Sequence, residues 1–221
     1  MPAFLLNLSV LSRITCNMKS MLSRVWIFLA ISLCPSTAAA QVIEYESGGV
    51  KHQTLTRNGI TVMFATTHAH VRDYAMIQVS VVNGSQIYST IRPEDFSFEL
   101  PDGQAIRASA ADTVVKDLLT RGNLSDVQKL VVAYEANLYG IANMRTTNGY
   151  ELRRRGAMAE GVAAKFKAAA AASALALVAT RLAPGQSTDG AVFFALEHKA
   201  LGAGKLIVHS GEEVYEFNAT Q

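Results

Sequence analysis

The hydrophobic pattern of this chain changes its period twice. Apolar and polar side chains alternate through much of residues 41–109, recur at three- and four-residue spacing over 110–180, and alternate again after Arg181. A period of two is typical of strands, and a period of 3.6 is typical of helices. The sequence therefore predicts a mainly β protein of the α+β class, interrupted by a block of about three helices over about 110–180.

The first β region contains two signals for its strands. Asn58-Gly59 separates two β-prone runs, which is the pattern of a tight hairpin. In the run 74–82, the side chains of one face are all apolar, as expected of a strand that lies on a hydrophobic core: Ala75, Ile77, Val79 and Val81. Pro101-Asp102-Gly103 then predicts a turn.

The helical block has recognisable starts and stops. Residues 114–119 have helical spacing that ends near Gly122, and Ser125 with Gln128 fits a capping box for a second helix. A third helix is expected over about 150–179, with an apolar row through Met158, Val162, Phe166, Ala170 and Leu177. At 1.5 Å per residue this helix would be about 45 Å long.

The alanine-rich run KFKAAAAASALALVATR, residues 165–181, belongs to this third helix. Its uninterrupted apolar part, residues 168–179, is well short of the roughly 20 residues that a membrane span requires. Alanine is a strong helix former, so we interpret the run as a packing helix and not as a linker or an anchor.

The last strands follow a turn-rich connection at 182–190 and include a hairpin with Ser210-Gly211 at its tip. So few strands bury too little surface to fold alone. We therefore expect them to complete the sheet that the first strands begin, giving one domain over 41–221. Separate β and α domains are the alternative.

Residues 1–40 have the layout of a secretory signal peptide and leader. Lys19 and Arg24 precede the apolar run VWIFLAISL, and small residues follow, so cleavage is expected between Ala40 and Gln41. Met18 and Met21 are alternative starts to Met1. Lipid anchoring at Cys34 is disfavoured, because Leu33 stands where a lipoprotein signal needs a small residue.

Removal of this segment changes the composition. Both cysteines, Cys16 and Cys34, would leave, so neither a disulfide nor a cysteine-ligated metal is expected. Of 20 basic residues three lie within 1–40, so 17 remain against 18 acidic residues, a net charge near −1. That balance does not favour nucleic acid as a partner.

Four segments together, YAMIQVSVVNGS, RPEDFSFELPDG, LAPGQSTDGAVFF and KLIVHSGEEVYEFN, resemble a broad group of secreted bacterial immunoglobulin-like β-sandwich proteins of unknown function. The resemblance covers about 55–104 and 182–217 and leaves out the helical block. It implies an immunoglobulin-like sandwich of about seven strands, and it brings no catalytic residues with it.

Few residues indicate chemistry. His68 and His70 share a face if they lie in a strand, so they are weak candidates for metal ligands, with His52, His198, His209 and Asp73 as further donors. The chain has no G-x-S-x-G motif. The carboxylates of Asp95 and Glu99 are interpreted as a solvated edge. No cofactor is expected.

Tyr139, which falls off the apolar stripe, and Arg153 and Arg154, in a basic cluster at the start of the third helix, are candidates for an interaction surface. For the arginines, a solvated helix face is the favoured interpretation, because consecutive helical residues point about 100° apart. The first hypothesis is an exported, non-enzymatic module, periplasmic or extracellular, that binds another envelope protein. The alternatives are a small-ligand or carbohydrate binder with its cleft where the helices meet the sheet, and a His-based metal carrier or metalloenzyme.

Overall fold

Strand β5 (Tyr74–Asn83) is the central element of the fold, because both of its faces and both of its edges are covered. The computed structural model describes residues 41–47, 49–65, 70–138, 163–197 and 201–219, with the backbone alone for 133–138. Residues 40–221 form one compact unit, and everything below concerns this unit.

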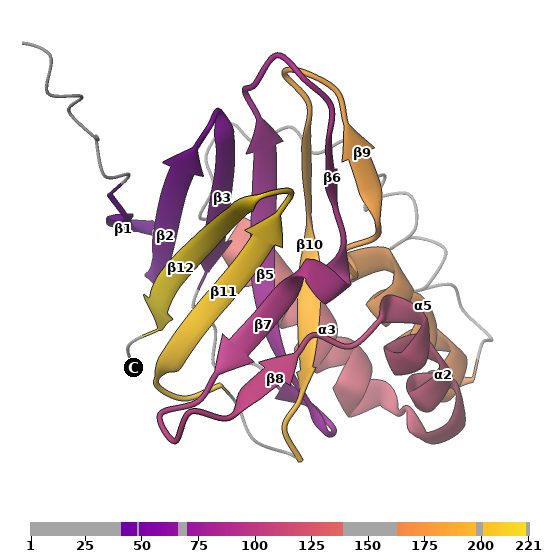
Figure 1. The fold of residues 1–221 in the computed structure, drawn as a ribbon. Coiled ribbons are helices and arrows are strands. Elements are labelled where there is room, and N and C mark those ends of the chain that lie inside the picture. Colours follow the sequence, from indigo (N-terminus) through magenta and orange to yellow (C-terminus); the bar gives the residue numbers. More distant parts are fainter. Residues whose placement is uncertain (1–40, 48, 66–69, 139–162, 198–200, 220–221) are drawn as a thin grey trace, which may run out of the picture. The chain divides into compact units, whose positions relative to one another are not determined.

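Two antiparallel sheets and one short pair of strands make up the β structure (Figure 1). The large sheet has the order β1-β2-β3-β5-β10, with β4 also beside β5: β1 (Ile43–Ser47), β2 (Val50–Arg57), β3 (Ile60–Ala65), β4 (His70–Val71), β5 and β10 (Ser187–Ala195). The small sheet has the order β12-β11-β7-β8: β12 (Glu213–Ala219), β11 (Gly204–Ser210), β7 (Phe96–Glu99) and β8 (Ala105–Arg107). The pair consists of β6 (Ser89–Ile91) and β9 (Thr180–Leu182).

The chain is mainly β with antiparallel sheets and three α-helices among the described residues, as the sequence predicts. The number of strands is higher than expected: the described residues form twelve and not about seven. Much of the excess comes from strands of two or three residues, which are too short to show an alternating pattern in the sequence.

The predicted hairpin at Asn58-Gly59 is confirmed. It joins β2 to β3, and both turn residues have positive φ angles, 45° and 78°. Such angles suit Asn and Gly and match the twist of the two strands.

The two sheets share a hydrophobic core, which includes the predicted apolar face of β5. Val62 and Phe64 of the large sheet meet Phe98 and Phe217 of the small sheet there, and all four are buried. The rings of Phe64 and Phe217 pack edge to face at 5.1 Å. Each such side chain contributes about 1.5–3 kcal/mol by burial.

The opposite face of β5 is buried as well, because helices form a third layer over it. These are α2 (Ala111–Arg121), α3 (Leu124–Leu138) and α5 (Ala164–Leu175). Tyr74, Met76 and Phe193 of the large sheet pack in one cluster with Leu118 and Leu175 of the helices. The large sheet thus lies between the small sheet and the helices (Figure 1).

The first helix ends at Gly122 as predicted, but the capping box predicted at Ser125 and Gln128 is wrong. Helix α3 begins at Leu124, and its box is made by Asn123 and Asp126. The Asp126 amide donates to Asn123 Oδ1 at 3.0 Å, and the Asn123 amide donates to Asp126 Oδ2 at 2.9 Å. Asn is as good a cap as Ser, so spacing alone could not choose between the two starts.

The structure tests the predicted helix over 150–179 only from residue 163 onward. There the prediction is wrong, because the helix covers only residues 164–175. Ala163 has an extended backbone (ψ 145°), so α5 begins at Ala164, and it ends at Leu175 because Ala176 is not helical (ψ 136°). The Leu177 amide instead donates to the Ala191 carbonyl of β10 at 2.8 Å. Phe166, expected on the packed face, is 49% exposed. At 12 residues the helix is about 18 Å long.

The last strands do complete the sheets that the first strands begin. β10 pairs with β5, and β11 pairs with β7. The predicted connection at 182–190 is too long, however, because Ser187 to Gly190 already pair with Val82 to Val79.

No helix in the described part of the chain is both long enough and apolar enough to cross a membrane.

Candidate functional site: a groove between β6 and the β11–β12 hairpin

The groove arises where the chain changes sheets between β6 and β7. β6 pairs with β9, whereas β7 pairs with β11 and β8. The short 3-10 turn η1 (Pro93–Asp95) lies between them. β7 pairs with β11 only as far as Val208, so β6 and the tip of the β11–β12 hairpin are not joined in a ladder.

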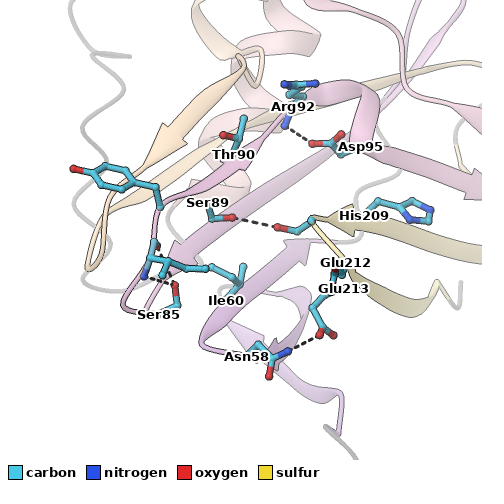
Figure 2. A pocket seen from close by; sticks show the side chains of 14 residues that line it. Asn58, Ile60, Ser85, Ser89, Thr90, Arg92, Asp95, His209, Glu212 and Glu213 are labelled. Atoms are coloured by element: carbon cyan, nitrogen blue, oxygen red, sulfur yellow. Dashed lines mark hydrogen bonds between the residues drawn. The ribbon is translucent and has the colours of Figure 1, made fainter.

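The resulting groove has a volume of about 600 Å³, within the range of roughly 300–1,000 Å³ that is usual for ligand sites. Figure 2 shows that its lining comes from the turn between β2 and β3, the segment from β5 to β6, the η1 turn and the β11–β12 tip. The sheets hold these tips in place, an arrangement that positions binding residues in many folds.

A contact between two serines crosses the middle of the groove. The hydroxyls of Ser89 on β6 and Ser210 on β11 are 3.3 Å apart. Figure 2 shows Asn58, Ile60 and Ser85 on one side of this contact and Thr90, Arg92 and Asp95 on the other. The serine contact therefore divides the groove into two ends, and a ligand that filled both would lie across it.

The first end is acidic. Glu212 and Glu213 lie at the tip of the β11–β12 hairpin, and Asn58 Nδ2 donates a hydrogen bond to Glu213 Oε1 (Figure 2). Glu212 is exposed, and its carboxylate makes no hydrogen bond or ion pair with the described residues.

The second end carries one arginine and one aspartate, Arg92 and Asp95. The Arg92 amide donates to Asp95 Oδ2 at 2.8 Å, which caps the η1 turn and turns the Asp95 carboxylate toward the backbone. The exposed Arg92 guanidinium has no carboxylate partner within the described part of the chain. The two ends thus carry unpaired groups of opposite charge.

The rim of the groove carries two apolar side chains. Ile87 is 72% exposed and Tyr88 is 60% exposed. The Arg181 guanidinium of β9 stacks over the Tyr88 ring at 4.4 Å, which covers one face of the ring. Large apolar side chains exposed side by side mark a contact surface more often than single ones do.

The segment that carries this rim is held by Asn83, a buried residue at the end of β5. Asn83 Nδ2 donates to the carbonyls of Ile87 (2.8 Å) and Leu182 (3.0 Å), and Asn83 Oδ1 accepts from the Ser85 amide (3.0 Å). The side chain therefore fixes the segment to β9 and presents Ile87 and Tyr88 in one conformation.

Tyr215 lies behind the acidic end. Its hydroxyl donates to the carbonyls of Arg57 (3.1 Å) and Ile60 (3.4 Å) in the large sheet. Burial, with a further contribution from the Glu213 carboxylate, raises the pKa of Tyr215 to about 12. Tyr215 is therefore a neutral donor at physiological pH and keeps the two hairpins that border this end together.

The Ser210 side chain, and not that of the preceding His209, makes the serine contact in the groove. Ser210 and His209 are successive residues of β11, so their side chains leave opposite faces of the strand, and the Ser210 hydroxyl faces that of Ser89.

Of the residues that the sequence singled out, His209 and Asp95 line this groove, and the others lie away from it or outside the described residues. Tyr139, Arg153, Arg154 and Ala40 lie outside them, and Gln41 is an exposed residue just before β1.

His68 also lies outside the described residues, and His70 is in β4. Of the further donors proposed for a metal, His52 is buried in β2 of the large sheet, His209 lies at the groove in the small sheet, and His198 is not described. No group of three metal-ligating side chains occurs among the residues that the structure describes. The two-histidine hypothesis stays a prediction.

Sequence reasoning missed the groove as a site, although two signals were present. Ile87-Tyr88 lies one residue after Asn83-Gly84-Ser85, and Glu212-Glu213 directly follows the predicted tip at Ser210-Gly211. The first pair places two large apolar side chains beside a turn, and the second places two carboxylates beside a hairpin tip. Nothing in the sequence shows that the two turns lie close together.

The chain was compared with protein-family models, with curated proteins and with solved structures, and none of them matches.

Proposed function

We propose that this chain is an exported, non-enzymatic interaction module of the cell envelope, and that the groove between β6 and the β11–β12 tip is its partner-binding surface. The observation that carries the proposal is the sheet change at η1. It leaves a groove with an exposed apolar rim and unpaired charges on a rigid frame. Rigid frames that present loops in this way lower the conformational entropy lost on binding.

The proposal includes an immunoglobulin-like sandwich as the frame. In that fold, strands A, B, E and D form one sheet and strands G, F and C form the other, with C′ beside C in some members. The order β3-β5-β10 is compatible with A-B-E, and the order β12-β11-β7-β8 is compatible with G-F-C-C′. The helical block then occupies the connection between C′ and E, and β1 and β2 extend the first sheet.

Export rests on residues 1–40, whose basic, apolar and small-residue regions follow the order of a secretory signal. Amino-terminal sequencing of the protein from a periplasmic or culture fraction tests it. The expected first residue is Gln41. Recovery of the uncleaved chain from the cytoplasm would overturn the export proposal while leaving the groove as it is.

The interaction proposal is tested by site-specific photo-crosslinking in the envelope fraction. A benzophenone amino acid replaces Tyr88 at the groove or Phe166 on α5, two aromatic residues that are both exposed. We expect a discrete adduct with a second protein from position 88 and none from position 166. Adducts from position 166 alone, or none from either position, would contradict the groove as the partner surface.

A further inference from the structure

The two ends of the groove differ in charge, and this difference restricts what can bind. Among the described residues, Glu212 supplies a carboxylate without a partner at one end, and Arg92 supplies a guanidinium without a carboxylate partner at the other, beyond the contact between Ser89 and Ser210. A ligand that is complementary to both must carry a cationic group and an anionic group separated along its length.

The rim of the groove adds an apolar requirement. Ile87 and Tyr88 project from the segment that Asn83 holds, and burying their exposed surface would stabilise a complex by about 25 cal/mol per Å² before binding costs. The side chain that covers them has to be apolar or aromatic.

Nucleic acid does not meet these requirements, because its uniform negative charge would be repelled by Glu212 and Glu213. A linear polypeptide segment meets them, because it presents basic, apolar and acidic side chains in succession along an extended backbone. The hydroxyls of Ser89, Thr90 and Ser210 are within the groove lining and can bond main-chain groups of such a segment.

We propose that the groove binds an extended segment of a partner polypeptide. A basic side chain of this segment pairs with Glu212, an apolar one covers Ile87 and Tyr88, and an acidic one pairs with Arg92. This inference rests on the proposed function and specifies the chemistry of the partner at the same site.

Selection from a library of random linear dodecamer peptides displayed on phage tests the proposal, with the purified chain as the target. We expect enriched peptides to share a basic residue and an acidic residue flanking an apolar one. For synthetic versions, Glu212→Lys or Arg92→Glu is expected to weaken binding by about tenfold or more, which is the scale of one charge-pair interaction. Ile87→Ser should weaken it similarly.

Glu216→Lys is the matched charge control, because Glu216 is an exposed glutamate of the neighbouring strand β12 that pairs with Lys205 outside the groove. Its peptide affinity should equal that of the wild type. Urea unfolding midpoints of all variants show whether each one is folded.

Three results would overturn the proposal: no enriched peptide, enriched peptides without the charge pattern, or peptides that bind the Glu212→Lys and Arg92→Glu variants unchanged. Binding of an oligosaccharide array through the same residues in place of peptides would also overturn it. If peptides fail while the adduct at position 88 forms, the module has a partner that is not a linear segment. If both fail, the proposed function fails with the inference.

Discussion

The Tyr215 hydroxyl donates a hydrogen bond to the Arg57 carbonyl at 3.1 Å, and so joins β12 of the small sheet to the β2–β3 turn of the large sheet. The ring is fully buried in the core between the sheets, and the same hydroxyl also reaches the Ile60 carbonyl at 3.4 Å. One side chain therefore closes the core beneath the acidic end of the groove.

Tyr215→Phe keeps the ring and removes the hydroxyl. We expect the free energy of unfolding to fall by about 1–2 kcal/mol, because the hydrogen bond that the hydroxyl shares between the Arg57 and Ile60 carbonyls is lost. Urea unfolding measures the change. Tyr88→Phe is the control, since Tyr88 is largely exposed and its hydroxyl is not tied into the core. Equal midpoints for wild type and Tyr215→Phe would show that the bond contributes nothing.

The ionisation of Tyr215 predicts a loss of stability at high pH. Burial raises its pKa to about 12 in the folded chain from an ordinary value of 10.0, so the unfolded chain loses the proton first. The stabilisation is complete below about pH 10 and is lost as the pH rises toward 12. We expect the stability difference between wild type and Tyr215→Phe to shrink across that window. A constant difference would contradict the prediction.

His52 predicts the opposite dependence at low pH. Burial lowers its pKa below the ordinary 6.5, its ring stacks on Tyr45 at 5.1 Å, and neither ring nitrogen has a hydrogen-bond partner in the part of the chain that the structure describes. Because the unfolded chain takes up the proton first, stability falls as the pH drops through about 6.5. His52→Leu should therefore have a flatter dependence of the urea midpoint between pH 7.5 and 5.5. An unchanged slope in His52→Leu would contradict the prediction.

Asp126 links the helical layer to the large sheet. It caps α3 and accepts from Arg72 Nε at 2.9 Å, with 5% of its side chain and 22% of that of Arg72 exposed. Asp126→Ala leaves Arg72 and the Asn123 amide without this acceptor, so we expect a loss of about 2–4 kcal/mol on urea unfolding. Asp112→Asn, in an ion pair with Lys116 whose members are 67% and 75% exposed, should leave the midpoint unchanged. If Asp126→Ala and Asp112→Asn lost similar amounts of unfolding free energy, burial would not be the reason why the Asp126 contacts matter.

Gly190 allows the segment after α5 to reach β10. A Cβ atom there would lie 2.5 Å from the Leu177 backbone, so Gly190→Ala must push this segment away. We expect a loss of about 1–3 kcal/mol and faster hydrogen exchange of the Leu177 amide, which donates to Ala191. Gly103→Ala is the control: its φ of 85° makes alanine strained, but a Cβ meets nothing within 4 Å. Unchanged exchange at Leu177 in Gly190→Ala would contradict the close approach.

The sequence by itself determined the class of the fold. The two-residue period around β5, the Asn58-Gly59 turn and the helical spacing before Gly122 are local signals, and each reports a backbone preference that the surroundings do not override. For the same reason, the sequence alone predicts the order of strands, helices and strands, and it predicts the hairpin tip at Ser210-Gly211.

Only the tertiary structure decided where α5 ends and where the groove lies. Alanine favours continuing the helix, but a hydrogen bond from Leu177 to β10 and the space at Gly190 stop it at Leu175. The groove depends on a change of sheet at Pro93–Asp95 that brings Ile87 and Glu212, far apart in the sequence, into one lining. Contacts of this kind depend on strands that are far apart in the sequence, so no local sequence pattern predicts them.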